Sequence, residues 1–180
     1  AAIWFCDLRG FTALSEHASR DQLLATLNDY FDVVAPAVEA EGGEILKFIG
    51  DGMLAMFPLQ TDAACRRALQ AALSVRERMA ELNQRRRAGG LDALALGIAL
   101  HVGEVMYGNI GSRSRLDFTV IGPAVNVASR IEGLSRRLGR DILLSGDFAL
   151  LCPYDFEPLG RHALPGIARE VEVFTVPEGA

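Results

Sequence analysis

The feature that most constrains this chain is a short turn between two apolar runs. Gly50-Asp51-Gly52 separates Glu44–Ile49 from Met53–Phe57. Two glycines supply the positive φ angles that a tight hairpin needs, and Asp-Gly is a strong hairpin signal between apolar segments. The sequence therefore predicts a β-hairpin with Asp51 at its tip. On pattern alone, Asp51 is either a turn former or a functional carboxylate.

The first strand of this hairpin carries Lys47, the only lysine in the 180 residues. Every other position occupied by lysine or arginine is an arginine. One interpretation is a strand lysine whose ammonium reaches solvent at a sheet edge. The other is that this position requires a compact, rotatable donor, which a planar guanidinium cannot replace.

A second carboxylate follows the first apolar run of the chain. Ile3–Asp7 predicts a buried strand that ends on Asp7, and Gly10 then predicts a turn into a short helix that begins at Phe11 and Thr12. An aspartate at the end of a central strand, beside the free N–H groups of a helix start, can hold a cation and phosphates together. The alternative is that Asp7 only caps the helix.

Two long helices are predicted around the hairpin. Ser19-Arg-Asp-Gln22 fits a capping box that opens a helix to about Glu41, in which Pro36 predicts a kink or a change of segment. Asp62 is predicted to cap the second helix. That helix closes with Arg85-Arg86-Arg87, which we interpret as a solvated last turn that complements the helix dipole.

The order of elements predicts the fold class. Leu94–Val102 predicts a strand in which His101 is a core or edge side chain, and Gly103-Glu104 predicts a turn into a second hairpin strand, Val105–Ile110, before a polar loop over 111–116. Strand, helix, hairpin, helix and strand form the split βαβ pattern. The expected fold is α+β: a ferredoxin-like βαββαβ core with a mostly antiparallel sheet, helices on one face and a C-terminal αβ extension. The extension is predicted as strand 141–145, a short helix near Phe148, and strands 156–163 and 171–176.

A third group of polar residues follows Gly122-Pro123, which predicts a helix start. Asn126 and Arg130 are four residues apart, so they project from the same side of that helix. An amide and a guanidinium side by side could orient a sugar oxygen and a phosphate. An ordinary exposed helix face is the alternative.

Length and composition limit the possible settings. Residues 1–180 suit a single domain without an internal linker, and a start inside a strand without methionine predicts a domain taken from a longer protein. No apolar run is long enough to cross a bilayer, and the net charge of −5 argues against nucleic acid and anionic membranes as partners. Three widely spaced cysteines favour a reducing, cytoplasmic setting over a disulfide framework or a zinc site. An anionic substrate would therefore need local positive charge or a bound metal.

Four motifs carry a resemblance to a known family. They are Asp7-Leu-Arg-Gly-Phe-Thr12, Lys47-Phe-Ile-Gly-Asp-Gly52, His101-Val-Gly-Glu-Val105 and Val120-Ile-Gly-Pro-Ala-Val-Asn-Val-Ala-Ser-Arg130. Together they resemble the catalytic domain of class III nucleotide cyclases, most closely the bacterial adenylate cyclases with threonine at the purine-reading position. The resemblance covers nearly the whole chain. It implies a ferredoxin-like core and a head-to-tail homodimer with two shared active sites.

The resemblance also implies a role for each matching residue. The substrate would be ATP, with two Mg²⁺ or Mn²⁺ ions in each active site, and regulatory domains would lie outside this chain. The implied roles are metal binding for Asp7 and Asp51, purine reading for Lys47 and Thr119, ribose orientation for Asn126, phosphate clamping for Arg130, and further substrate contacts for Phe11 and Thr12.

The chain departs from the family pattern at two positions. Many relatives have aspartate where this chain has Thr119, with Asp117 two residues earlier. A subset with threonine is often responsive to bicarbonate or CO₂, which raises that possibility here. Pro165 stands where relatives often place a basic residue near the triphosphate tail, and either Arg161 or Arg169 is a candidate to replace it.

Two other functions are alternatives to an adenylate cyclase. A diguanylate cyclase is suggested by Glu41-Gly-Gly-Glu44, but here the hairpin tip is Gly-Asp-Gly and the Gly-Gly pair precedes the strand. A catalytically silent regulatory module that keeps the fold would be favoured by loss of the metal, ribose or phosphate residues. All of these residues are present, which favours the enzyme.

Overall fold

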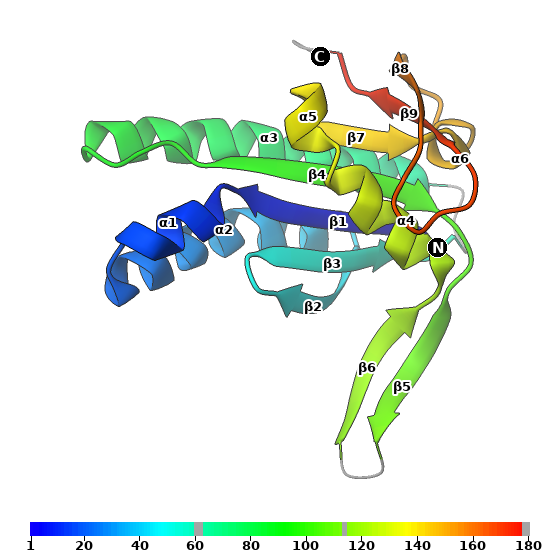
Figure 1. Cartoon of the computed structure of the whole chain (residues 1–180), viewed down its shortest axis with the longest axis horizontal. Coiled ribbons are helices and arrows are strands. Elements are labelled where there is room, and N and C mark those ends of the chain that lie inside the picture. Colours follow the sequence, from blue (N-terminus) through cyan, green and yellow to red (C-terminus); the bar gives the residue numbers. More distant parts are fainter. Residues whose placement is uncertain (60–62, 113–114, 178–180) are drawn as a thin grey trace.

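The computed structural model describes residues 1–59, 63–112 and 115–177 (Figure 1). Its elements are β1 (Ala2–Arg9), α1 (Phe11–His17), α2 (Arg20–Ala40), β2 (Glu44–Ile49), β3 (Gly52–Phe57), α3 (Ala64–Ala88), β4 (Ala95–Val102), β5 (Met106–Ser112), β6 (Arg115–Ile121), α4 (Pro123–Glu132), α5 (Ser135–Leu138), β7 (Ile142–Ser145), α6 (Gly146–Ala149), β8 (Glu157–His162) and β9 (Val171–Thr175). No helix in this described part of the chain is long and apolar enough to span a bilayer.

Seven strands form one sheet in the order β2-β3-β1-β4-β7-β9-β8. β1 lies between β3 and β4 and is antiparallel to both, whereas β4 and β7 are parallel. The first four strands have the order of a ferredoxin-like core, and β7, β9 and β8 extend it at one edge. The predicted α+β class is confirmed.

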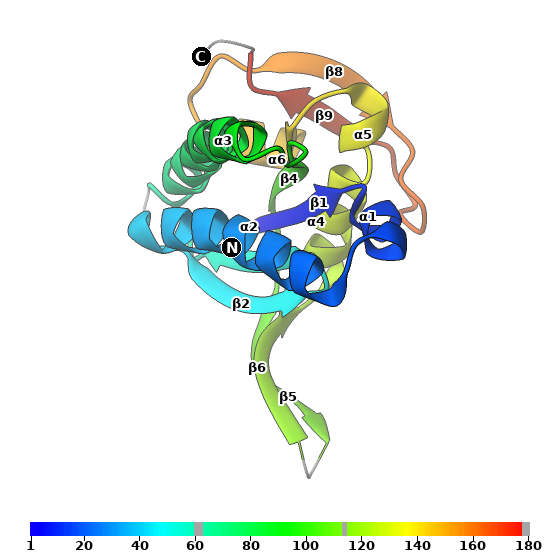
Figure 2. The same cartoon turned by 90° about the vertical axis from the view of Figure 1, so that its left-hand side faces the viewer.

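The strand alternation of β1 separates two apolar layers. Trp4 and Cys6 face α2 and α3 in the larger core, while Ile3 faces the opposite side, where α4 packs. Figure 2 shows α2 and α3 on one side of β1 and α4 on the other. The two core helices therefore share one face, as predicted, and α4 covers part of the second face.

The second hairpin forms differently from the prediction. β4 has β1 on one side and β7 on the other, so both of its edges are occupied and it cannot pair with β5. β5 pairs instead with β6, from Met106↔Ile121 to Ser112↔Arg115, and most of the expected polar loop is strand. The two strands form an arm that extends away from the main sheet (Figure 1).

Three smaller predictions concern the long helices. The capping box of Ser19 and Gln22 is confirmed by both of its hydrogen bonds, and α2 continues through Pro36 instead of changing segment there. The prediction that the arginine run is solvated is wrong for Arg86. This side chain is buried and contacts Asp29 at 3.2 Å. Asp62 lies outside the described residues.

His101 is a buried core residue, as predicted. Its Nδ1 lies 2.7 Å from the Ser145 hydroxyl, which also accepts the Phe148 N–H at 3.2 Å. The hydroxyl hydrogen is therefore free to be donated to Nδ1, and this arrangement requires a neutral imidazole. Burial lowers the pKa of His101 to about 4.

This lowered pKa predicts a pH-dependent stability. Between pH 6.5 and 4 the unfolded chain binds a proton at His101 that the folded chain does not, so the stability present above 6.5 is lost on acidification, by up to about 3 kcal/mol. We expect His101→Gln, which cannot protonate, to flatten the dependence of the free energy of unfolding on pH in this window. Urea unfolding at several pH values measures it, and an unchanged pH slope in the variant would rule out His101 as the cause.

Candidate active site

Asp7 and Asp51 lie next to each other at one end of the sheet. Asp7 pairs with Gly52 of β3 and Gly97 of β4, and the N–H of Leu8 donates to the carbonyl of Asp51 at 3.4 Å. A Cβ at position 52 would lie 2.7 Å from the Cys6 carbonyl oxygen, so only glycine lets the turn lie this close to β1. The structure thus brings together the two carboxylates that the sequence placed 44 residues apart.

The charge of this pair is only partly compensated. Burial, then the nearby Asp51 and Glu132 carboxylates, raise the pKa of Asp7 to about 7. Like charges that approach in a half-buried site oppose ionisation. A bound cation would relieve this repulsion, and carboxylate oxygens are ligands that Mg²⁺ and Mn²⁺ prefer.

Glu132 is a third acidic residue at this end of the sheet, and the sequence interpretation missed it. It ends α4, and Ser135 donates a hydrogen bond to its Oε1 at 3.2 Å. In the sequence it is an ordinary glutamate at a helix end. Its proximity to Asp7 depends on how α4 crosses the sheet, which no local pattern reports.

Lys47 lies on the face of the sheet that α4 covers. A bulge between Ile45 and Lys47 shifts the register, so that Lys47 pairs with Leu54. Leu54 packs with residues of α4, and side chains directly opposite each other in a ladder share a face. The sequence left two interpretations of Lys47, an ammonium that reaches solvent and a hydrogen-bond donor that the position requires. Its partly buried position on this face is consistent with a donor to a ligand.

Thr119 is buried within β6. Only 5% of the residue is exposed, and its Oγ1 has no hydrogen-bond partner in the described part of the chain. A buried hydroxyl without a partner costs about 1–3 kcal/mol, so such an atom points to a ligand. The hydroxyl of Tyr107, on the paired strand β5, donates to Glu44 at the start of β2, which ties the arm to the strand that carries Lys47.

Asn126 and Arg130 project from the exposed side of α4. The helix buries its other side against the sheet through Ala124, Val127, Ala128 and Ile131. Both polar side chains are exposed and have no hydrogen bond or ion pair with Asp7 or Asp51 among the described residues. They therefore lie on the side of α4 that faces away from the sheet.

Phe11 and Thr12 begin α1, directly after Gly10. The Phe11 ring packs against the larger core, and Thr12 is exposed, its carbonyl accepting from Ser15 at 2.6 Å. Their position near the end of β1 agrees with the expectation, but the packing of Phe11 indicates a structural role for its ring.

Comparison with known proteins identifies the family. The sequence profile described as the adenylate and guanylate cyclase catalytic domain matches residues 1–177. The chain belongs to the adenylate and guanylate cyclase catalytic domain family. This cyclase domain is 34% identical over 176 residues to adenylate cyclase 1 of Rhizobium meliloti (strain 1021), covering 96% of this chain and 26% of the relative. It is 41% identical over 160 residues to adenylate cyclase of Anabaena cylindrica, covering 86% of this chain and 31% of the relative.

Solved structures of cyclases share its fold. The adenylyl cyclase CyaB from P. aeruginosa superposes with a TM-score of 0.89 at 29% identity, covering 99% of this chain and 94% of that one. The guanylyl cyclase Cya2 superposes with a TM-score of 0.85 at 30% identity, covering 99% and 93%. The cyclase domain thus resembles proteins named for either purine, and it spans under a third of the two curated relatives.

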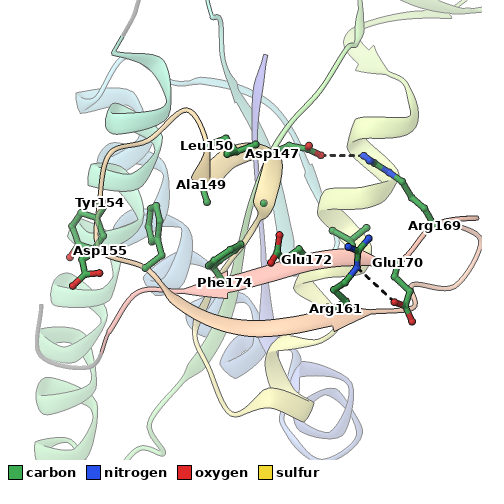
Figure 3. A pocket seen from close by; sticks show the side chains of 13 residues that line it. Asp147, Ala149, Leu150, Tyr154, Asp155, Arg161, Arg169, Glu170, Glu172 and Phe174 are labelled. Carbon is green, nitrogen blue, oxygen red and sulfur yellow. Dashed lines mark hydrogen bonds and ion pairs between the residues drawn. The ribbon is translucent and has the colours of Figure 1, made fainter.

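The two candidate arginines for the triphosphate tail line one pocket of the cyclase domain, of about 420 Å³, between α6, β8 and β9 (Figure 3). Arg169 contacts Asp147 at 3.2 Å, and Arg161 lies 3.9 Å from Glu170. β7 runs parallel to β4, so its carboxyl end and this pocket lie at the end of the sheet opposite to Asp7. Neither arginine can therefore contact a triphosphate that is bound at Asp7 and Asp51 of its own chain.

Proposed function

We propose that this domain is an adenylate cyclase that converts ATP to 3′,5′-cyclic AMP and pyrophosphate in the cytoplasm. The ribose 3′-oxygen would attack the α-phosphorus in line with the departing pyrophosphate. The observation that carries the proposal is the Asp7–Asp51 pair, two carboxylates held together at a sheet end with only partly compensated charge. The adenylate cyclases that match most of the chain support the choice of reaction.

The residues present fit a divalent cation site. Asp7 and Asp51 supply two hard oxygen ligands. In the described ranges no group of three or more His, Cys, Asp or Glu side chains could hold an ion, so the protein itself would supply only these two carboxylates. Substrate phosphates and water would then complete the coordination, as is usual for Mg²⁺. Two bound Mg²⁺ or Mn²⁺ ions would lower the pKa of the 3′-hydroxyl and neutralise charge on the phosphate oxygens.

The other assigned residues would bind and orient the nucleotide. Lys47 donates to N1 of adenine, and the Thr119 hydroxyl accepts from the exocyclic amine. Asn126 orients the ribose, while the guanidinium of Arg130 holds phosphate oxygens and stabilises the charge that develops on them. Arg161 or Arg169 is proposed to neutralise the triphosphate tail.

These residues are proposed to act across a head-to-tail homodimer. One protomer would supply Asp7 and Asp51, and its partner would supply Lys47, Thr119, Asn126 and Arg130. The exposed side of α4 supports this arrangement, because Asn126 and Arg130 face away from the sheet that carries the aspartates of their own chain. Two equivalent active sites would result.

Base selectivity follows from the hydrogen bonds of the purine edge. Guanine has a donor at N1, so the Lys47 ammonium would face an N–H group in a site that excludes water, whereas the Thr119 hydroxyl could turn to donate to O6. We expect kcat/KM for ATP to exceed that for GTP by up to about 10⁴-fold. Incubation of the domain with each nucleotide and Mn²⁺, with the products identified by mass, measures both the reaction and the preference. Equal kcat/KM values would defeat the assignment of Lys47 and Thr119, and the absence of any cyclic nucleotide would defeat the proposed function.

A further inference from the structure

Asp7 lies between two glycines of the neighbouring strands, and the surface of these three strands around Asp7 is named the trough. Gly52 and Gly97 are the partners of Asp7 in the neighbouring strands, so the positions on both sides of Asp7 carry no side chain. Directly opposite residues of a ladder share a face of the sheet. Ile3 is four residues before Asp7 in β1, so both side chains point to the same face of the sheet. Because Ile3 packs against α4, this is the face that α4 covers.

Glu132 fills this trough on the Gly97 side. A Cβ at position 97 would overlap the Oε1 of Glu132 and the Oγ of Ser135, and would lie 3.0 Å from the Cβ of Ser135. The carboxyl group of Glu132 therefore lies directly over the backbone of the residue that pairs with Asp7. The missing side chain at Gly97 makes room for it.

The carboxyl group of Glu132 is held in place from two directions. Ser135 donates to its Oε1 at 3.2 Å, which fixes the carboxyl relative to α5. Arg9 lies on the same face of β1 as Asp7, and its guanidinium donates to the carbonyl of Arg140, so it is anchored beside the trough. Burial raises the pKa of Glu132, while the hydrogen bond from Ser135 and the charge of Arg9 oppose this rise.

We propose that Glu132 is a positioning residue for the divalent cation site, adding a third negative charge beside Asp7 and Asp51 without being a ligand. The inference rests on the proposed function. Among the described residues Glu132 forms no group of three potential ligands with the two aspartates, so a charge role is assigned to it and not a ligand role. Its charge would draw cations to the two aspartates, and Arg9 would keep the trough from carrying three uncompensated carboxylates when no cation is bound.

Mn²⁺ binding to the domain without nucleotide tests this role directly. Gln has the size of Glu and can still accept from Ser135, so Glu132→Gln removes the charge and little else. A unit charge beside a divalent cation in a half-buried site changes its affinity substantially, and we expect the Mn²⁺ Kd to rise about tenfold. The control is Asp29→Asn, which removes one negative charge from the Arg86 pair at another site and should leave the Kd unchanged. Electron paramagnetic resonance of free Mn²⁺ provides the measurement.

Gly97→Ala provides a second test that changes no charge. The added methyl group would push the Glu132 carboxyl out of the trough, so the Mn²⁺ Kd should rise in the same direction. Asp51→Ala is the reference for loss of a ligand. If Asp51→Ala loses Mn²⁺ while Glu132→Gln keeps the wild-type Kd, Glu132 is only structural and the inference is overturned. If Asp51→Ala binds Mn²⁺ as well as the wild type does, the metal site itself, and with it the proposed function, is overturned.

Discussion

Asp7→Ala and Asp51→Ala will each reduce turnover by roughly 10³-fold or more, while the domain stays folded. Either substitution removes one of two carboxylates that the structure holds together, so the cations that stabilise charge in the reaction would lose a ligand, at a cost of several kcal/mol of barrier. Steady-state turnover with ATP and Mn²⁺ is the measurement. Near-normal turnover with unchanged Mn²⁺ dependence in either variant would contradict the metal role.

The stability of the same variants separates lost chemistry from lost folding. Because the pKa of Asp7 is raised to about 7, ionising it destabilises the folded state without metal, and the penalty grows as the pH rises from the unfolded pKa to about 7 and is constant above that. We therefore expect the metal-free Tm of Asp7→Ala to equal or exceed that of the wild type at pH 8, with a smaller difference at pH 5. Asp29→Asn, which also removes one carboxylate charge, is the control for turnover and should keep the wild-type value; it is not a control for Tm, because it leaves the buried Arg86 without its ion pair. A lower Tm together with lost turnover would instead indicate a folding defect.

The core of the fold could be predicted because its signals are local. The apolar runs on either side of Gly50-Asp51-Gly52 determine a hairpin locally, and Gly50 has a positive φ of 62°. The prediction that both glycines supply positive φ angles is wrong for Gly52, which begins β3 and pairs with Ile49, so the turn residues are Gly50 and Asp51. The capping box at Ser19 likewise depends on residues three apart in the sequence. Such features depend only on neighbouring residues, so the sequence predicts them without knowledge of the rest of the fold.

The features that the sequence could not predict depend on contacts between distant segments. Val105–Ile110 pairs with β6 because β7, which lies about forty residues later in the chain, occupies the free edge of β4. Arg86 is buried because Asp29 of another helix lies beside it. Glu132 joins the site only through the path of α4 over Gly97. None of these partners is near in the sequence, so composition and periodicity carry no information about them.

The arrangement of the assigned residues within one chain argues for shared active sites. Lys47 lies in β2, and Asp51 lies in the turn that follows this strand. Asn126 and Arg130 face away from the sheet that carries Asp7. Two protomers arranged head to tail would bring the two groups together.

Mixing two inactive variants will restore activity if the sites are shared. Asp51→Ala should be inactive for lack of a metal ligand, and Arg130→Ala should lose roughly 3–4 kcal/mol of transition-state stabilisation. In a mixed dimer one site carries both defects, while the other is intact. With random exchange at equal amounts half of the dimers are mixed, so the mixture should regain about a quarter of wild-type activity.

The measurement that tests the central claim most directly is therefore the rate of cyclic AMP formation by this equimolar mixture. Subunit exchange is verified first, by resonance energy transfer between differently labelled protomers, and Arg130→Ala mixed with wild type serves as the reference for dilution. We predict that each variant alone is inactive and that the mixture recovers about a quarter of the wild-type rate. A mixture that exchanges subunits and stays inactive would contradict the shared active site.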